Sequence, residues 1–256
     1  MKLVAVMPVW QRYDLTALIL RQWYQQIHRL RGQIDLHLVV VGSEGVRSSA
    51  LVSGYSDGMS YAETDNAPLN RKWNVGLEVA RYLDPDAVLT VGSDDLVSDS
   101  LLFAYAAKLK TGLQFFGLTD LYFFDAASLR LGHWPGYGPA RMPHRAGEPI
   151  GCARAHGRAV LERVGWRLWP DAPARNNSMD FASFQHLAAH GFQPQTFTLA
   201  ELGAKSVDIK VGAGVTTYAR IPYATEQRGA AALRYLSDLV DEPGLQQLTT
   251  RWRAAA

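Results

Sequence analysis

The apolar and polar positions of the chain predict strands and helices that alternate through its first half. Short apolar runs bounded by turn-forming or charged residues are typical of strands covered on both faces. Apolar residues at helical spacing, such as Leu15, Ile19 and Trp23, predict amphipathic helices between these runs. The order is typical of an α/β fold with a Rossmann-like, mixed but mainly parallel central sheet flanked by helices. The expected elements are strands at 2–9, 36–41, 59–63 and 87–91, and helices at about 15–31 and 66–82.

The second half of the chain predicts shorter elements around a basic loop. Residues 113–125 are rich in aromatic side chains and predict a strand pair or one long bent strand, with 129–137 as its partner. Residues 136–145 combine Gly, Pro and basic side chains, the composition of a surface loop. No internal repeat or linker is found, so a single domain is expected. The remaining expected elements are helices at 100–110, 157–164, 181–189 and 230–239, and strands at 195–199 and 206–211, before a polar tail.

Two adjacent carboxylates, Asp94 and Asp95, follow the strand predicted at 87–91. Neighbouring aspartates repel each other and are costly to bury. A hard divalent cation that also faces phosphate oxygens would relieve that cost. The alternative is a solvated turn in which Asp95 or Ser98 caps the following helix.

Polar residues also follow two other predicted strands, at Val9-Trp10 and at Gly42-Ser43-Glu44. In open parallel sheets, ligands bind beyond the carboxyl ends of the strands. We therefore expect these two segments and the aspartate pair to converge on one crevice.

Composition limits the function classes without selecting one. Hydrophobic residues make up 48% and charged residues 20% of the 256 residues, which is ordinary for a globular protein with a sizeable core. The net charge of +2 permits an anionic ligand. The sequence lacks the clustered Lys and Arg of most nucleic-acid binders. The single cysteine, Cys152, fits a reducing compartment, and no apolar run has the length of a transmembrane helix. We expect a cytoplasmic protein of a bacterial or phage-infected cell, without integral membrane association.

These features, in this order, resemble the nucleotide-sugar glycosyltransferases of the GT-A fold, and family 2-like enzymes among them. The set comprises a first strand ending in Pro8, a second ending in Gly42-Ser43-Glu44, a helix opened by an Asn/Lys/Asn/Gly pattern, the aspartate pair, and the lone Asp180 before a late helix. The resemblance covers roughly residues 2–199.

Three positions depart from the family pattern. Ser43-Glu44 stands where aspartates are usual, and Lys72-Trp73-Asn74 stands where an arginine-asparagine pair is usual. Met179-Asp180 stands where an acid pair is common. These departures concern the donor contacts more than the fold.

The resemblance implies a metal-dependent glycosyltransferase of the hexosyltransferase type, which moves a sugar from a nucleotide-sugar, expected to be a UDP-sugar, to an acceptor hydroxyl. Asp180 is then the general base, and a base in that role implies inversion of configuration. The resemblance also implies Mn²⁺ or Mg²⁺ as the cofactor, with Asp94 and Asp95 as its ligands. His186, about two turns along the late helix, is a further candidate, as a ligand of the metal or of a phosphate.

The resemblance further divides the chain by task. Residues 1–97 would form the nucleotide-sugar half, 98–225 the acceptor half and 226–256 a C-terminal helical tail. Glu44 is expected near the uracil or ribose, and Arg12 or Lys72 near the base or the phosphates. The full set of implied donor contacts is Pro8, Trp10, Arg12, Gly42, Ser43, Glu44, Asn66, Lys72, Asn74 and Asp94.

The same residue types also have structural interpretations. Asp180 would favour the macrodipole at the start of a helix. Asn66 and Asn74 would cap and pack a helix, and His186 would be an ordinary helical histidine. Asp208 either contributes a further acid to the site or lies in a half-buried strand.

The acceptor is expected to be a glycan or, alternatively, a hydroxymethylated base in phage DNA. In the basic loop, His144 and Arg145 either close over the diphosphate or are solvated loop charges. Trp134, Trp166 and Trp169 are either stacking surfaces for a sugar or base, or core residues. The arginines that would contact DNA phosphates, unless they form a solvated face, are Arg141, Arg145, Arg154, Arg158, Arg163 and Arg167.

Two other functions stay open on the sequence. A nucleotidyltransferase uses a similar sheet and metal-binding carboxylates, although Pro8-Val-Trp10-Gln-Arg12 is not the glycine-rich basic loop that such enzymes carry after the first strand. A catalytically inactive GT-A-like module would bind a nucleotide-sugar without turnover. Dinucleotide-binding oxidoreductases, phosphate-loop NTPases, serine hydrolases with a nucleophile elbow and zinc sites are disfavoured, because their motifs do not occur.

Overall fold

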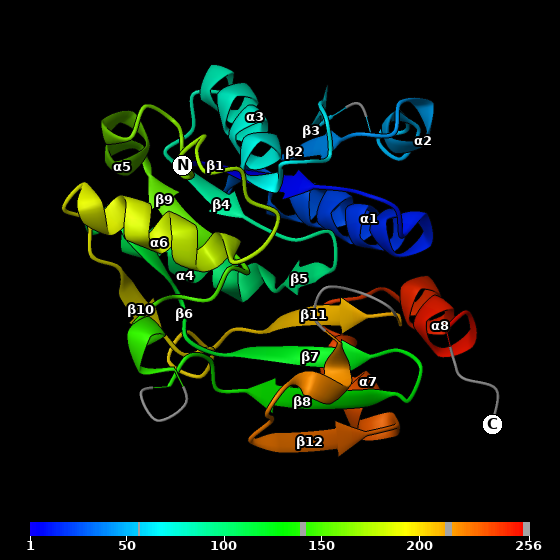
Figure 1. Cartoon of the computed structure of the whole chain (residues 1–256). Coiled ribbons are helices and arrows are strands. Elements are labelled where there is room, and N and C mark those ends of the chain that lie inside the picture. Colours follow the sequence, from blue (N-terminus) through cyan, green and yellow to red (C-terminus); the bar gives the residue numbers. More distant parts are fainter. Residues whose placement is uncertain (56, 139–141, 213–216, 253–256) are drawn as a thin grey trace.

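Two β-sheets organise the chain, and helices pack around them (Figure 1). The computed structural model describes residues 1–55, 57–138, 142–212 and 217–252. The larger sheet has seven strands and the smaller sheet has five. The candidate site lies where the chain passes from one sheet to the other.

The larger sheet is mixed and mainly parallel. Its strands are β1 (Lys2–Pro8), β2 (Asp35–Gly42), β3 (Met59–Glu63), β4 (Ala87–Thr90), β6 (Phe115–Leu118), β9 (Arg154–Gly157) and β10 (Gln195–Phe197). The spatial order is β10-β6-β9-β4-β1-β2-β3. β1 pairs in parallel with β2 and β4, whereas β9 runs antiparallel to both of its neighbours. The fold class predicted from the sequence is therefore confirmed.

The smaller sheet joins segments that are far apart in the sequence. Its strands are β5 (Asp95–Val97), β7 (Leu121–Asp125), β8 (Arg130–Trp134), β11 (Ser206–Lys210) and β12 (Thr225–Arg228). The spatial order is β12-β8-β7-β11-β5. β5 continues from the end of β4 after a short turn, so the two sheets meet next to the aspartate pair.

Apolar side chains on both faces of the larger sheet explain why helices cover it from two sides. The helices are α1 (Tyr13–Leu30), α2 (Val46–Ser49), α3 (Leu69–Tyr82), α4 (Asp99–Lys110), α5 (Arg158–Arg163), α6 (Met179–Ala189), α7 (Ala230–Leu236) and α8 (Glu242–Thr250). Along β1, Leu3 and Met7 pack into the core that contains α1 and α4, while Val4 and Val6 pack into the core that contains α3, α5 and α6. This alternation is the period of two expected of a strand. Among the described residues, no helix is both long and apolar enough to cross a bilayer.

The structure differs from the predicted elements where strands are very short. Residues 113–125 contain two strands, β6 and β7, that lie in different sheets and do not form a pair or one bent strand. Residues 154–157 form β9, where the sequence predicts only a turn into a helix. α8 lies in the polar end of the segment 226–256, which the sequence analysis expects to be helical. A strand of four residues such as β9 shows too few alternations for its period to be recognised, so its pairing partners decide its structure.

Replacing Gly76 with alanine should destabilise the fold by about 1–3 kcal/mol, despite the better helix propensity of alanine. A Cβ atom at this position would lie 2.4 Å from Val6 Cγ1 and 2.8 Å from Val41 Cγ2, so α3 would have to move away from the sheet. Urea unfolding measures the effect. The control is Gly54→Ala, because no heavy atom lies within 4 Å of a Cβ atom there. Equal unfolding midpoints for the two variants would contradict the prediction.

Candidate functional site

The aspartate pair forms a three-carboxylate cluster with Asp208. Asp94 lies between β4 and β5, and Asp95 is the first residue of β5. Asp208 on β11 is the register partner of Asp95 in the antiparallel pair of β5 and β11. Carboxylate oxygens of the three residues lie within 4.8 Å of one another. Strand pairing in the smaller sheet therefore adds a distant acid to the pair that the sequence places at the end of β4.

Two cationic side chains bind this carboxylate cluster. Arg12 donates from Nη1 to Asp94 Oδ2 at 2.8 Å and from Nη2 to Ser93 Oγ at 2.9 Å. Lys210 Nζ lies 2.7 Å from both carboxylate oxygens of Asp208 and 3.4 Å from Asp94 Oδ2. Arg12 precedes α1 in the left-handed conformation, with φ of 46°. The arrangement places positive charge beside Asp94 from two different elements.

The three carboxyl groups differ in pKa because their neighbours differ. Burial, and then the charge of Asp94, raises the pKa of Asp95 to about 7. Burial and Asp94 also raise the pKa of Asp208 well above its ordinary value. Burial opposes the ionisation of Asp94 as well, but Lys210 and Arg12 outweigh it and hold the pKa of Asp94 below its ordinary value. Asp94 is therefore charged at neutral pH, whereas Asp95 changes its protonation state near neutral pH.

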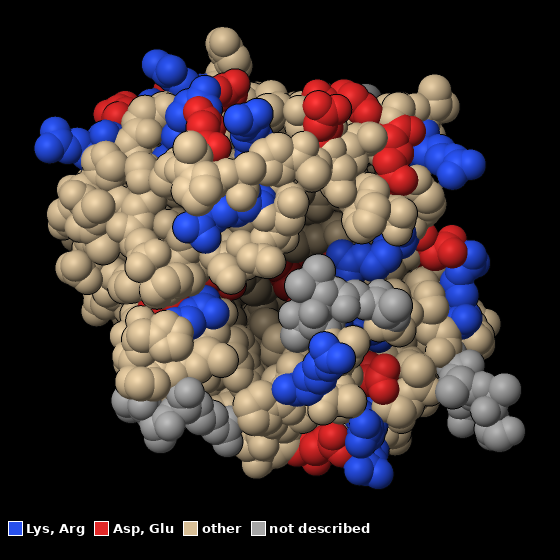
Figure 2. Space-filling model, viewed as in Figure 1, with Lys and Arg blue, Asp and Glu red and all other residues tan. Residues whose placement is uncertain are grey.

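The carboxylate cluster lines a cleft of about 480 Å³. Figure 2 shows the cleft as a hollow in the middle of the molecular face, with acidic atoms visible inside it. Asp180 lines the same cleft, together with aromatic side chains that include Trp134 and Tyr137. The structure thus brings the sequence-predicted Asp94, Asp95 and Asp180 into one cavity.

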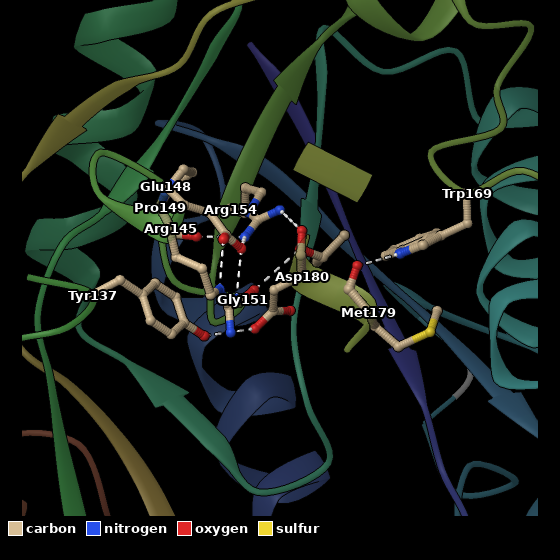
Figure 3. A network of polar contacts seen from close by, with 10 residues as sticks. Tyr137, Arg145, Glu148, Pro149, Gly151, Arg154, Trp169, Met179 and Asp180 are labelled. Atoms are coloured by element: carbon tan, nitrogen blue, oxygen red, sulfur yellow. Dashed lines mark hydrogen bonds and ion pairs between the residues drawn. The ribbon is translucent and has the colours of Figure 1, made fainter. Parts of the chain in front are cut away.

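A buried ion-pair network holds Asp180 at the start of α6 (Figure 3). Tyr137 donates its hydroxyl to Asp180 Oδ2 at 3.4 Å. Arg154 donates to the main-chain carbonyl of Asp180 at 2.9 Å and lies 3.3 Å from Glu148 Oε1. Arg145 binds Glu148 through two hydrogen bonds of 2.7 Å, and its guanidinium lies 3.6 Å from the centre of the Tyr137 ring. These contacts fix both the main chain and the carboxylate of Asp180.

Gly151 leaves the space that the Asp180 carboxylate fills. A Cβ atom at Gly151 would lie 2.3 Å from Asp180 Oδ1. The preceding residue, Met179, is anchored to the core because its carbonyl accepts a 2.8 Å hydrogen bond from Trp169 Nε1. The position of Asp180 therefore depends on close packing as well as on hydrogen bonds.

Three of the residues implied as donor contacts form a second polar cluster, at the ends of β1 and β2. The Lys72 ammonium donates to the Val9 carbonyl at 2.6 Å, to Ser43 Oγ at 3.0 Å and to Asn66 Oδ1 at 3.0 Å. Burial lowers the pKa of Lys72 to about 8. Lys72 thus joins α3 to the strand ends and has three protein oxygens as its partners.

The other residues implied for the donor lie around these strand ends. Pro8 ends β1, and Trp10 follows it with 49% of its surface exposed. Glu44 accepts a 2.7 Å hydrogen bond from a backbone N–H of the segment after β1. Gly42 serves packing, since a Cβ atom there would lie 2.2 Å from the Tyr61 hydroxyl.

Asn74 and His186 make contacts elsewhere. Asn74 is buried in α3 and donates to the Trp169 carbonyl at 2.8 Å. His186 is half-buried on α6, where its ring centre lies 4.6 Å from that of His190. Within the described part of the chain, the acidic, His and Cys side chains that lie close enough together to hold a metal ion are the three aspartates. His186 is not among them.

The three candidate stacking tryptophans have different environments. Trp134 lines the cleft. Trp166 and Trp169 are core residues with 4% and 3% of their surface exposed. Stacking on a ligand is therefore confined to Trp134 among these three.

Most of the arginines considered for phosphate contacts have acidic partners. Arg154 is buried in the Asp180 network. Arg158 and Arg167 each form an ion pair of 2.6 Å with an acidic side chain. Arg163 is exposed on α5, and Arg141 lies outside the described residues.

The sequence analysis assigns no role to Lys210, Tyr137 or Glu148. A role for Lys210 could have been predicted, because it follows Asp208 by two residues and side chains at that spacing share one face of a strand. Tyr137 and Glu148 had none, since their contacts with Asp180 and Arg154 join separate segments.

No family model matches the chain, and no sequence among curated proteins matches it. Its fold is similar to crystal structures of S. aureus TarS 1–349, alone and in complex with UDP, at a TM-score of 0.48 with 12% and 13% identity. Both matches cover 98% of this chain and 70% of that chain. The complex of TarS 1–349 with UDP-GlcNAc matches at a TM-score of 0.45 and 12% identity, over 98% of this chain and 71% of that chain. These likenesses concern the overall fold and not the site.

Proposed function

We propose that the chain is a glycosyltransferase that moves a sugar from a nucleotide-sugar, with a UDP-sugar as the first choice, to an acceptor hydroxyl. One observation carries this proposal: Asp94, Asp95 and Asp208 cluster within 4.8 Å and line the same cleft as Asp180. Such a transfer needs groups that counter the charge of a diphosphate and a separate base for the acceptor hydroxyl. The cleft presents candidates for both.

The carboxylate cluster fits a hard divalent cation, because Mg²⁺ and Mn²⁺ prefer oxygen ligands. We assign Asp94, Asp95 and Asp208 as the residues that would hold it. Asp208 takes the place of His186 in this assignment, since it lies in the cluster. When bound, the cation would neutralise charge that develops on the leaving diphosphate.

Asp180 is proposed as the general base. Its carboxylate is oriented by the Tyr137 hydroxyl and by close contact with Gly151. A carboxylate held in this way can accept the proton of the acceptor hydroxyl as its oxygen attacks the anomeric carbon. A single displacement of this kind inverts the configuration at that carbon.

The ends of β1 and β2 are proposed to bind the nucleotide. Lys72 positions Ser43 and Asn66 there through its hydrogen bonds. Arg12 is the stronger candidate for a diphosphate contact, because its guanidinium lies 2.8 Å from Asp94 at the carboxylate cluster. Glu44 remains the proposed partner of the uracil or ribose.

A donor screen tests the proposed function. We expect UDP release from UDP-glucose, UDP-galactose or UDP-N-acetylglucosamine with Mn²⁺ or Mg²⁺, and its loss in EDTA. Release of UDP supports glycosyl transfer, whereas release of pyrophosphate from a nucleoside triphosphate and a sugar phosphate would indicate a nucleotidyltransferase. Binding without release would indicate an inactive module. Failure to bind or turn over any UDP-, GDP- or dTDP-linked sugar would exclude the proposal.

A glycan hydroxyl is the acceptor that we propose first. Arg154 is buried and Arg158 and Arg167 are ion-paired, which leaves fewer cations free for DNA phosphates. DNA containing hydroxymethylcytosine is the comparison acceptor. Transfer to that DNA, falling steeply with salt, would reverse the choice.

A further inference from the structure

The ammonium group of Lys210 lies among the carboxylates, at a position that would also suit a metal cation. It follows Asp208 by two residues on β11, and its side chain is 10% exposed. Its ammonium lies 2.7 Å from both Asp208 oxygens and 3.4 Å from Asp94 Oδ2. The Phe123 ring centre lies 5.3 Å from Nζ and covers it on one side. The ammonium is thus a resident partner of two of the three carboxylates.

A divalent cation and Lys210 compete for the same oxygen atoms. Magnesium and calcium ions bind oxygen ligands at roughly 2.0–2.6 Å. Both oxygens of Asp208 are already in contact with the ammonium, and Asp94 Oδ2 also accepts from Arg12 at 2.8 Å. Two positive groups within one partly buried cluster repel each other strongly. Binding of the ion to Asp208 therefore requires the ammonium to move.

We propose that Lys210 is an internal counter-ion, which stabilises the carboxylate cluster in the absence of metal and is displaced by the divalent cation toward the diphosphate of the donor. The flexible four-carbon side chain of lysine permits this movement without a change in β11. The diphosphate is the anion that the donor adds to the cleft, so this second half of the inference rests on the proposed function.

Displacement of Lys210 couples metal binding to donor binding. The cation favours the state in which the ammonium has left Asp208, and the diphosphate favours the same state because it receives the ammonium. Without a donor, the cation must displace the ammonium from Asp208 with no new partner for it. Lys210 therefore lowers the affinity for metal alone and makes metal and donor bind cooperatively.

The test is calorimetric titration with Mn²⁺, first without nucleotide and then with saturating UDP. Lys210→Met removes the charge and keeps the length of the side chain, and we expect it to bind Mn²⁺ at least about tenfold more tightly than wild type without nucleotide. Lys210→Arg keeps a competing cation and should behave like wild type. The matched control is Lys205→Met, which removes the same charge from a lysine paired with Asp238 outside the cluster. Circular dichroism confirms that each variant is folded.

The titrations test the competition between Lys210 and Mn²⁺ separately from the coupling to UDP. Equal or weaker Mn²⁺ binding by Lys210→Met, or equal tightening by Lys205→Met, would overturn the competition. UDP should increase Mn²⁺ affinity by a larger factor in wild type than in Lys210→Met, and an equal factor would overturn the coupling. If UDP affects neither protein, the donor assignment fails, while the titration without nucleotide still decides whether Lys210 competes with metal.

Discussion

Replacing Asp95 with asparagine should lower glycosyl transfer by about 10³-fold and, at pH 8, make the protein more stable. The pKa of Asp95 is raised by burial and by Asp94 to about 7 in the folded protein, above the roughly 3.9 of an unfolded aspartate. The folded state therefore holds its proton more tightly, and the stability that this provides below about pH 4 is lost as the pH rises through about 7. Asparagine does not ionise, so the variant avoids this loss. We expect a gain of about 1–3 kcal/mol at pH 8 and none at pH 4.

Chemical unfolding between pH 4 and pH 8 measures this effect, in EDTA so that no cation stabilises the wild type. UDP release measures the activity. Asp171→Asn is the control, because Asp171 is exposed and its ion pair with Arg167 is a surface pair of small energy. A variant that is less stable than wild type at pH 8 would show that Asp95 ionises without cost. Undiminished glycosyl transfer by the variant would show that Asp95 has no role in the reaction.

The pattern along the chain was sufficient to predict the part of the fold that depends on local sequence. β3 spans Met59–Glu63, the range that the sequence predicts, and α4 lies within one residue of its predicted start. The apolar runs of β1 and β4 fix their burial on both faces, and the turn residues after β4 place Asp94 and Asp95 at a strand end. Local periodicity therefore predicts the sheet and one side of the site.

Contacts between distant segments could not be predicted in this way. Asp208 reaches the aspartate pair only through the register of β5 and β11, and β5 has three residues. On the sequence alone, Asp208 is either a further acid of the site or a residue of a half-buried strand. Only the pairing of β5 with β11 decides between these two interpretations. The same limit applies to Lys72, since lysine is rarely buried without a partner and its partners lie on three separate segments.

Replacing Asp180 with asparagine should reduce kcat by about 10²- to 10⁴-fold, the usual contribution of a general base. Asparagine keeps the shape of the side chain and can still accept the hydrogen bond from Tyr137, but it cannot take a proton at neutral pH. Asp180 lies outside the carboxylate cluster, so the affinities for Mn²⁺ and UDP should stay at their wild-type values. Initial rates and calorimetry separate these two effects.

Gly151→Ala tests whether the position of Asp180 matters as well as its charge. The added Cβ atom would lie 2.3 Å from Asp180 Oδ1 and would push the carboxylate aside, so kcat should fall by up to about 10²-fold with KM for the donor unchanged. Gly54→Ala, with no heavy atom within 4 Å of the new Cβ atom, is the control and should leave kcat unchanged. If Asp180→Asn keeps its kcat while UDP binding is intact, another group removes the proton. If only Asp180→Asn loses activity, Asp180 acts as the base, but the close packing at Gly151 does not set its position.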